Sequence, residues 1–234
     1  MVAGMIATPL FAQGGDERRW LAVVVAAALF VCGLAIAVHA HGRRAMLAAA
    51  GIVVFTFLVE VIGSTTGFPF GAYDYTDRLG PQLFDVPVVV SFAWAGITLV
   101  VHGALRGVRS GGAVSDWVIR LAVMAGAITA WDVFLDPQMV GEGYWVWQPA
   151  SVAFRGIPIV NYLGWLSTAS ITSAIALVVC GAPRRATRLP VVVYTTLAVL
   201  STIGFVAFFD DLVVAVAGGL SMGVFVVVAP RHTT

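Results

Sequence analysis

Seven apolar runs of roughly twenty residues each constrain what this chain can fold into. Hydrophobic residues make up 60% of its 234 positions and charged residues only 11%, which leaves too little polar surface for a soluble domain of this length. We therefore predict an all-α, polytopic transmembrane helix bundle with about seven spans, forming a single domain over residues 1–234. The predicted spans are residues 20–38, 45–63, 86–104, 117–136, 158–180, 190–209 and 212–229.

Two details bear on this count. Asp210 and Asp211 form a tight joint between the last two runs, so six spans is the alternative. The apolar run from Met5 to Ala12 is followed by no convincing cleavage pattern. We expect a short N-terminal tail there and not a signal peptide.

The distribution of arginine predicts the orientation. Eight arginines fall on the side of the odd-numbered connections and the C-terminal tail: Arg43, Arg44, Arg106, Arg109, Arg184, Arg185, Arg188 and Arg231. Four fall on the other side, Arg18, Arg19, Arg78 and Arg155, and Arg120 lies in the first turn of the fourth span. Because the arginine-rich side faces the cytoplasm, we expect a multi-pass cell-membrane protein with its N-terminus outside and its C-terminus inside.

The two long outer loops, residues 64–85 and 137–157, are rich in glycine, proline and aromatic residues. Loops of about twenty residues in a compact bundle are commonly functional. We expect both to fold back onto the bundle as a lid whose aromatic rings pack at or below the membrane interface.

The loops and their flanking spans carry one pattern twice. In each copy two aromatic residues follow an acid by 13 and 15 positions, and a tryptophan follows a proline by seven. The pattern predicts a parallel internal repeat related by an axis along the membrane normal. Coincidence is the alternative, because aromatic belts place Trp and Tyr at outer interfaces anyway. The first copy is Glu60, Tyr73, Tyr75, Pro87 and Trp94, and the second is Asp132, Trp145, Trp147, Pro158 and Trp165.

Acidic residues inside the apolar spans are the strongest functional signal. Glu60 and Asp132 each lie about 22 Å along a hydrocarbon core of about 30 Å. Asp136 lies one turn beyond Asp132, and Asp85 and Asn161 begin the third and fifth spans. These positions predict a polar layer in the outer third of the bundle, roofed by Tyr and Trp.

Each member of this layer has a structural alternative. Asp85 and Asn161 are well placed to cap helix N-termini, and Asp210 and Asp211 to cap the last two spans. Glu60 and Asp132 could instead be a buried hydrogen-bonded pair or partners of Arg155 or Arg78. We favour function for these two acids, because ionisable groups at membrane depth usually serve a site.

Buried carboxyl groups beside aromatic rings suit carbocation chemistry. Desolvation favours the neutral acid, so one carboxyl group can donate a proton while its neighbour stays ionised. Aromatic faces stabilise a developing cation. Together they can protonate an alkene, after which water adds or a proton is lost. The candidate catalytic residues are Glu60, Asp132 and Asp136, and the candidate substrate-binding residues are Tyr73, Tyr75, Asp85, Trp94, Tyr144, Trp145, Trp147, Asn161 and Trp165.

Several classes of protein are disfavoured. The chain has no lysine, so a retinal Schiff base cannot form, and it has no glycine-rich phosphate fingerprint for a flavin or nicotinamide. All four histidines, His39, His41, His102 and His232, fall near the cytoplasmic side, away from the acidic layer. Cys32 and Cys180 lack metal-type spacing and are interpreted as inert thiols. We expect no metal, no cofactor and, from a net charge of +1, no nucleic-acid partner.

At these residues the chain resembles the integral membrane carotenoid-biosynthesis family that includes bisanhydrobacterioruberin hydratases of C50 pathways and γ-carotene or lycopene 1′-hydratases. The resemblance covers about half the chain, from the second to the fifth span. It rests on Glu60, Gly67-Phe-Pro-Phe-Gly-Ala-Tyr-Asp-Tyr75, Leu79-Gly-Pro81, Val86-Pro87, Trp131-Asp132, Leu135-Asp-Pro-Gln-Met-Val140, Gly143-Tyr-Trp-Val-Trp147, Gly156-Ile-Pro158, Asn161 and Gly164-Trp165.

The resemblance implies addition of water, without a cofactor, to the terminal isopropylidene double bond of an acyclic carotenoid, giving a tertiary alcohol. The implied partners are a long carotenoid, water and membrane lipid, with other carotenoid-pathway membrane enzymes as neighbours. On the physical argument, Asp132 or Glu60 protonates the alkene, and the other carboxylate or Asp136 deprotonates the water. Two alternatives stay open: a carotenoid end-group cyclase, and a non-catalytic carotenoid or lipid carrier or proton-coupled transporter.

Overall fold

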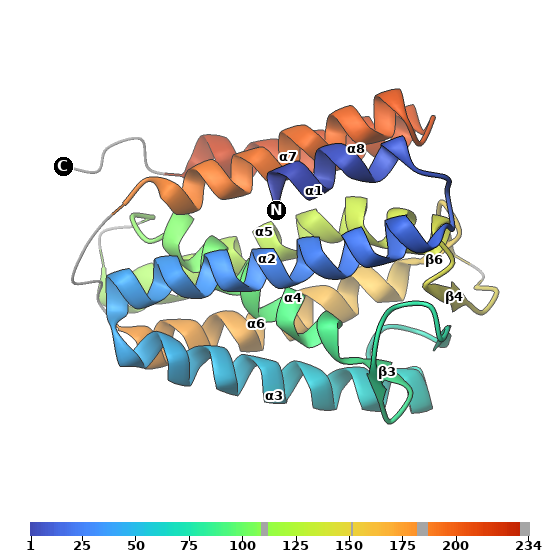
Figure 1. Ribbon diagram of the computed structural model, residues 1–234. Helices are drawn as coiled ribbons and strands as arrows, with labels where there is room; N and C mark the ends of the chain where they lie inside the picture. Colours follow the sequence, from blue (N-terminus) through green and yellow to red (C-terminus); the bar gives the residue numbers. More distant parts are fainter. Residues whose placement is uncertain (109–111, 151, 182–186, 230–234) are drawn as a thin grey trace.

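The computed structural model describes residues 1–108, 112–150, 152–181 and 187–229 as a bundle of helices (Figure 1). A short helix, α1 (Val2–Ala7), and a 3-10 turn, η1 (Thr8–Leu10), precede seven longer helices. The all-α membrane bundle is thus confirmed, and each predicted span corresponds to one helix. The seven are α2 (Asp16–His41), α3 (Arg43–Thr66), α4 (Val88–Ala104), α5 (Ala113–Gly141), α6 (Ile159–Cys180), α7 (Leu189–Ala207) and α8 (Leu212–Val228).

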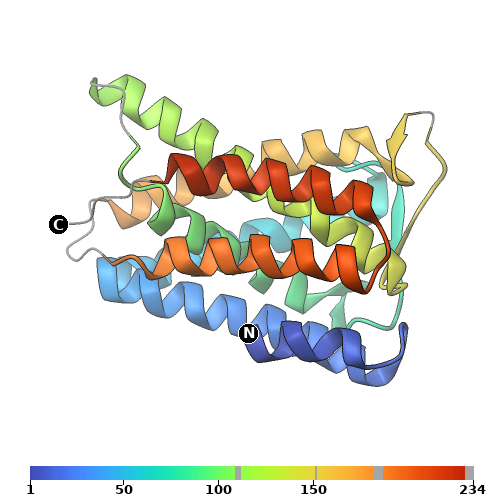
Figure 2. The same cartoon turned by 90° about the horizontal axis from the view of Figure 1, so that it is seen from above.

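Helix length divides these seven into two groups. Among the described residues, α2, α3, α5, α6 and α7 are long and apolar enough to cross a membrane. The helices α4 and α8 are apolar but only 17 residues long. The helix α4 contacts α2, α3, α5, α6 and α7 and lies in the middle of the bundle (Figure 1), which explains why most of its side chains are buried. Turning the molecule shows α7 and α8 side by side along one face (Figure 2).

The N-terminal segment (residues 1–15) differs from the prediction of a short tail. Its apolar run forms α1 and η1, which pack against α2, and α1 also contacts α7. Met1 and Met5 contact the buried core, so the segment has an apolar face of its own to cover. Of the arginines that predicted the orientation, Arg109, Arg184, Arg185 and Arg231 lie outside the described residues.

The two outer loops meet through a small strand pairing at one end of the bundle. The strand β1 (Tyr73–Tyr75) pairs antiparallel with β4 (Trp145–Trp147), with Asp74 opposite Val146. Each loop then forms a short hairpin before the next helix (Figure 1). The hairpin strands are β2 (Gln82–Leu83) with β3 (Val86–Pro87), and β5 (Ala153–Phe154) with β6 (Ile157–Pro158).

This arrangement supports the predicted internal repeat. Helix, strand, hairpin and helix follow in the same order from α3 to α4 and from α5 to α6. Two equivalent strands related by a two-fold axis must pair antiparallel about their central residues. The pairing of β1 with β4 about Asp74 and Val146 meets that requirement.

Glycines set the close approach of α2 and α4. A Cβ atom built at Gly33 would lie 2.6 Å from the carbonyl oxygen of Gly96, and one built at Gly96 would lie 2.8 Å from the backbone nitrogen of Phe30. The obstacle in each case is backbone, which cannot rotate away as a side chain can. Small residues at such a crossing are how membrane helices pack tightly.

Replacing Gly96 with Ala should destabilise the bundle by about 1–3 kcal/mol, because α2 and α4 must separate. The matched control is Gly223→Ala in α8, where an added Cβ meets no atom of the described residues within 4 Å. That change should be neutral or stabilising, since Ala favours a helix over Gly by about 1 kcal/mol. Thermal unfolding in detergent compares the two variants. Equal stability of both would contradict the tight crossing.

Candidate active site

A cavity of about 350 Å³ lies between the bundle, β1 and β4, and the N-terminal segment. Its walls are mostly apolar and aromatic, and Glu60, Asp136 and Asn161 contribute buried polar groups. The predicted residues Tyr73, Tyr75, Trp94, Tyr144, Trp145, Trp147 and Trp165 also line it, whereas Asp132 and Asp85 are not among the described residues that do. Three members of the predicted polar layer, Glu60, Asp136 and Asn161, thus line the cavity.

Glu60, near the end of α3, accepts three hydrogen bonds. The hydroxyls of Tyr73 and Tyr75 donate to Oε2 at 2.7 and 2.8 Å, and the indole Nε1 of Trp94 donates to Oε1 at 2.9 Å. Alternate residues of a strand point to the same face, so β1 directs both tyrosines at one carboxylate. The absence of a side chain at Gly63 leaves space for the Tyr73 hydroxyl, since a Cβ at this position would lie 2.9 Å from the hydroxyl oxygen.

Asp136, near the end of α5, has an equivalent environment. Trp145 and Trp147 donate from Nε1 to Oδ1 at 2.6 and 3.1 Å, and the Asn161 side-chain nitrogen donates to Oδ2 at 2.5 Å. The strand β4 directs its two tryptophans as β1 directs its tyrosines. The spacing pattern paired these tryptophans with Asp132, and the structure pairs them with the acid one helical turn later.

Asp132 lies behind Asn161, fully buried. Its Oδ2 accepts from the same Asn161 nitrogen at 2.8 Å, so one amide bridges Asp132 and Asp136. Its Oδ1 is buried with no hydrogen-bond partner among the described residues, as is the hydroxyl of Tyr162. Tyr162 interacts electrostatically with both aspartates and was missed from the sequence, because one tyrosine at the start of an apolar helix has no distinguishing pattern.

Stacked aromatic rings form the cavity wall around the carboxylates. The rings of Tyr73 and Trp147 lie 4.9 Å apart, and those of Trp94 and Trp165 stack at 4.0 Å. Trp131 packs edge-on against Trp165 and also lines the cavity. The sequence had pointed to its neighbour Asp132 instead.

The loop tyrosines keep their protons. Burial and the adjacent Glu60 raise the pKa of Tyr73 and Tyr75 above the ordinary tyrosine value. Burial and Glu142 raise the pKa of Tyr144 to about 12. These hydroxyls are therefore hydrogen-bond donors at neutral pH.

Two capping predictions were wrong. Asp85 is exposed in the turn between β2 and β3, with φ of 60°, and Pro87 occupies the N-cap of α4. Asn161 is the third residue of α6, whose N-cap is Pro158, so its side chain is free to bridge the aspartates. The predicted cap at Asp211 is confirmed, since its Oδ1 accepts from the Val214 backbone nitrogen at 3.1 Å.

Neither arginine proposed as a partner of the buried acids reaches them. Arg155 pairs with Asp211, and Arg78 donates to the backbone carbonyl of Gly14. The carboxylates are instead held by neutral donors from tyrosine, tryptophan and asparagine. Arg18, the arginine that lines the cavity, is paired with Glu142, so the charge of Glu60 and Asp136 stays available to a positive charge that develops on the substrate.

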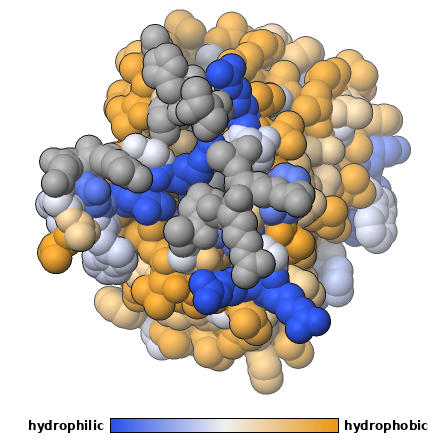
Figure 3. All heavy atoms as spheres, turned by 90° about the vertical axis from the view of Figure 1, so that its left-hand side faces the viewer, coloured by the Kyte–Doolittle hydropathy of each residue, from blue (hydrophilic) through white to orange (hydrophobic). Residues whose placement is uncertain are grey.

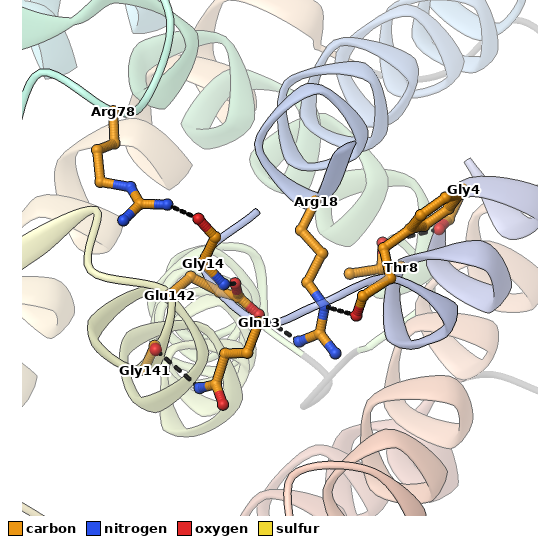
Figure 4. Close-up of polar contacts among 9 residues, drawn as sticks. Gly4, Thr8, Gln13, Gly14, Arg18, Arg78, Gly141 and Glu142 are labelled. Atoms are coloured by element: carbon orange, nitrogen blue, oxygen red, sulfur yellow. Dashed lines mark hydrogen bonds and ion pairs between the residues drawn. The ribbon is translucent and has the colours of Figure 1, made fainter. Parts of the chain in front are cut away.

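A buried ion pair holds the N-terminal segment over the cavity (Figure 4). Arg18 donates from Nη1 to Oε1 of Glu142 at 2.6 Å and from Nε to the carbonyl of Phe11 at 2.8 Å. The second carboxylate oxygen of Glu142 accepts from the Gly14 backbone nitrogen at 2.9 Å. Gln13 adds a bond to the carbonyl of Gly141 at 2.8 Å. These contacts tie residues 11–18 to the end of α5.

Fold and site together define an integral membrane protein whose buried carboxylates face an apolar, aromatic cavity. The sequence model of the family described as carotenoid biosynthesis protein matches residues 19–226, and the chain belongs to that family. The resemblance to a carotenoid-biosynthesis family noted from the motifs is thereby confirmed.

One curated relative is similar to part of the chain. It is the bisanhydrobacterioruberin hydratase of Haloarcula japonica, 31% identical over 130 residues. The alignment covers 55% of this chain and 43% of the relative, so this chain matches less than half of that protein's length. No solved structure matches the chain.

Proposed function

We propose that this protein is a carotenoid hydratase that adds water to the terminal isopropylidene double bond of an acyclic C40 or C50 carotenoid, giving a tertiary alcohol. The observation that carries the proposal is that Glu60 of α3 and Asp136 of α5 line the same apolar cavity. Both are held by aromatic donors. The partial similarity to a named hydratase supports the same conclusion.

The cavity suits one end of a long polyene. It extends from the buried carboxylates to Ile6 and Leu10 of the N-terminal segment and to Ile203 and Phe208 of the α7 region, all exposed apolar side chains. In a membrane these side chains face lipid. A cavity of 350 Å³ has the size of a pocket for a drug-sized group, so one end group enters while the rest of the polyene lies along the bundle.

Asp136 and Asp132 supply the proton in this proposal. Two carboxyl groups bridged by one amide nitrogen hold one proton between them, because two adjacent negative charges repel. Asp136 faces the cavity and therefore delivers the proton. The π electrons of the alkene form the new C–H bond at the less substituted carbon, and the tertiary carbon becomes the cation.

Glu60 completes the reaction as the base. A water molecule attacks the tertiary cation with an oxygen lone pair, forming the C–O bond, and passes a proton to Glu60. Transfer of that proton back to the aspartate pair restores both groups, so the net change is one water added. The faces of Tyr73 and Trp147 stabilise the cation until water arrives.

Mass spectrometry of pigments tests the reaction. The chain is expressed in a lycopene-producing host and, in parallel, in a host that makes a C50 bisanhydro-type precursor, each with an empty-vector control. A gain of about 18 Da per reacted end, from acid–base addition of water, is the expected result. An unchanged mass with altered absorption would favour a cyclase. Unchanged pigment in both hosts would favour a carrier or transporter.

We also propose that the protein is a single membrane domain oriented with its N-terminus outside, which puts the carboxylates near the outer face. The excess of arginine at the opposite end supports this. A green fluorescent protein fused to the C-terminus should fluoresce, and alkaline phosphatase fused there should be inactive. The reverse pair of results would overturn the orientation.

A further inference from the structure

Three side chains that commonly bind transition metals meet at the end of the bundle away from the carboxylates. His41 ends α2, His102 lies in the last turn of α4, and Cys180 ends α6. Their ligand atoms lie within 4.8 Å of one another. Helix α3 starts beside His41 and reaches Glu60 about 25 Å further along, so this cluster is separate from the proposed active site.

All three side chains are buried, and one ring nitrogen of each histidine has no hydrogen-bond partner among the described residues. His41, His102 and Cys180 are 6%, 2% and 1% exposed. The Nδ1 atoms of both histidines are buried without a hydrogen-bond partner among the described residues. A buried polar atom left unpaired is costly, and a native protein usually satisfies it with a protein group, a water or an ion.

The ring arrangement is compatible with shared coordination. The two imidazole centroids lie 5.2 Å apart, and the rings are tilted by 44°. The His41 ring also lies close enough to the backbone carbonyl of Cys180 to interact with it, a contact of the kind that orients metal-binding histidines. Two ligands of a tetrahedral zinc ion lie about 3.5 Å apart, so a contraction of about 1 Å closes the site.

The donor set and its surroundings favour Zn²⁺. Imidazole nitrogen and thiolate sulfur are standard zinc ligands, and three protein ligands leave a fourth position for water. A small cavity of about 10 Å³ adjoins both histidines, which is close to the room that one water needs. Arg106 and Thr187 also line that cavity.

Helix ends and Arg120 set the charges around the cluster. All three residues lie at helix C-terminal ends, where the partial negative charge of the helix favours a cation. The positive charge of Arg120 acts on both imidazoles and opposes one. Cysteine binds zinc as the thiolate, whose negative charge would offset that of Arg120. Figure 3 faces this end of the molecule, where hydrophilic residues gather within a hydrophobic surround.

We propose that His41, His102 and Cys180 form a zinc site, with water as the fourth ligand, that joins the ends of α2, α4 and α6. The sequence motifs predicted no metal, because spacing along the chain cannot reveal three ligands that come from three helices. The inference is independent of the proposed hydratase activity.

Metal content of the purified full-length chain tests the site. The protein is produced with an affinity tag that contains no histidine, incubated with zinc chloride in detergent, desalted and analysed by elemental mass spectrometry. About one zinc ion per chain is expected, together with a higher thermal unfolding temperature than in chelator, because the ion binds only the folded state. Cobalt in place of zinc should give a thiolate-to-cobalt charge-transfer band.

Matched variants assign the ligands. Cys180→Ser and His102→Gln should lose the zinc and the cobalt–thiolate band. The control variants Cys32→Ser and His39→Gln replace the other cysteine and a neighbouring histidine of α2. Both controls should keep the zinc and the cobalt–thiolate band. A wild-type chain that binds neither ion overturns the proposal even if a ligand variant fails to fold. Retention of the band in Cys180→Ser also overturns it.

Discussion

Replacing Glu60 with Gln should lower the rate of carotenoid hydration by a factor of about 10²–10⁴, the usual contribution of a general acid or base. The amide keeps the size of the side chain but cannot take a proton from water. Its nitrogen also cannot accept the hydrogen bonds that the two tyrosines or Trp94 now donate. Hydrated product per unit of membrane protein, measured by chromatography, gives the rate.

Asp136→Asn should cause a loss of the same order, because Asp136 is the proton donor that faces the cavity. Asp132→Asn should also reduce the rate, since it removes the group that shares the proton. The matched controls are Glu17→Gln and Asp74→Asn, which make the same changes at exposed acids. Full activity in both Glu60→Gln and Asp136→Asn would show that these residues are not the catalytic base and acid.

Breaking the buried pair of Arg18 and Glu142 should have the largest effect on stability. Arg18→Met leaves Glu142 as a buried carboxylate without its cation, and the side chains of this pair are only 8% and 2% exposed. Removing one partner of such a pair typically costs about 3–5 kcal/mol. We expect a much lower unfolding temperature in detergent and a loosened N-terminal segment, read out as faster proteolysis within residues 1–15.

The neighbouring arginine supplies the control. Arg19 contacts an exposed Asp16 at 3.4 Å and lies 5.3 Å from the ring centre of an exposed Trp20. Because these contacts are at the surface, Arg19→Met should leave stability nearly unchanged. Replacing both members, as Arg18→Met with Glu142→Gln, should recover part of the lost stability because no unpaired charge remains. An Arg18→Met variant as stable as Arg19→Met would show that the pair does not hold the segment.

The fold was largely predictable because one physical constraint dominates it. Apolar runs of bilayer length must form helices, and the acids at their outer ends had to face the protein interior. The alternation of β-strand side chains then explains why Tyr73 and Tyr75 reach one carboxylate and Trp145 and Trp147 another. The spacing in the sequence had placed these four aromatic residues beside buried acids, and in the structure each of them donates to one.

Errors arose where helix rotation or distant packing decides the outcome. Counting offsets paired the tryptophans with Asp132, whereas the turn of α5 presents Asp136 to them. The place of Asn161 at the start of its span favoured a cap, but Pro158 is the N-cap of α6 and Asn161 bonds to the two aspartates instead. The partners of Glu142 come from the first eighteen residues, and the zinc ligands come from three helices. The sequence pattern alone reveals neither the partners of Glu142 nor the proposed zinc ligands, because each set comes from distant parts of the chain.

The origin of the product oxygen is the sharpest test of hydration by this protein. Purified protein in detergent or lipid is supplied with lycopene or a C50 precursor in water enriched in ¹⁸O. We expect a tertiary alcohol that is heavier than the substrate by about 20 Da per reacted end, against about 18 Da in ordinary water, because acid–base addition takes the oxygen from solvent. A product without the heavy isotope, or no gain in mass, would contradict hydration by these carboxylates.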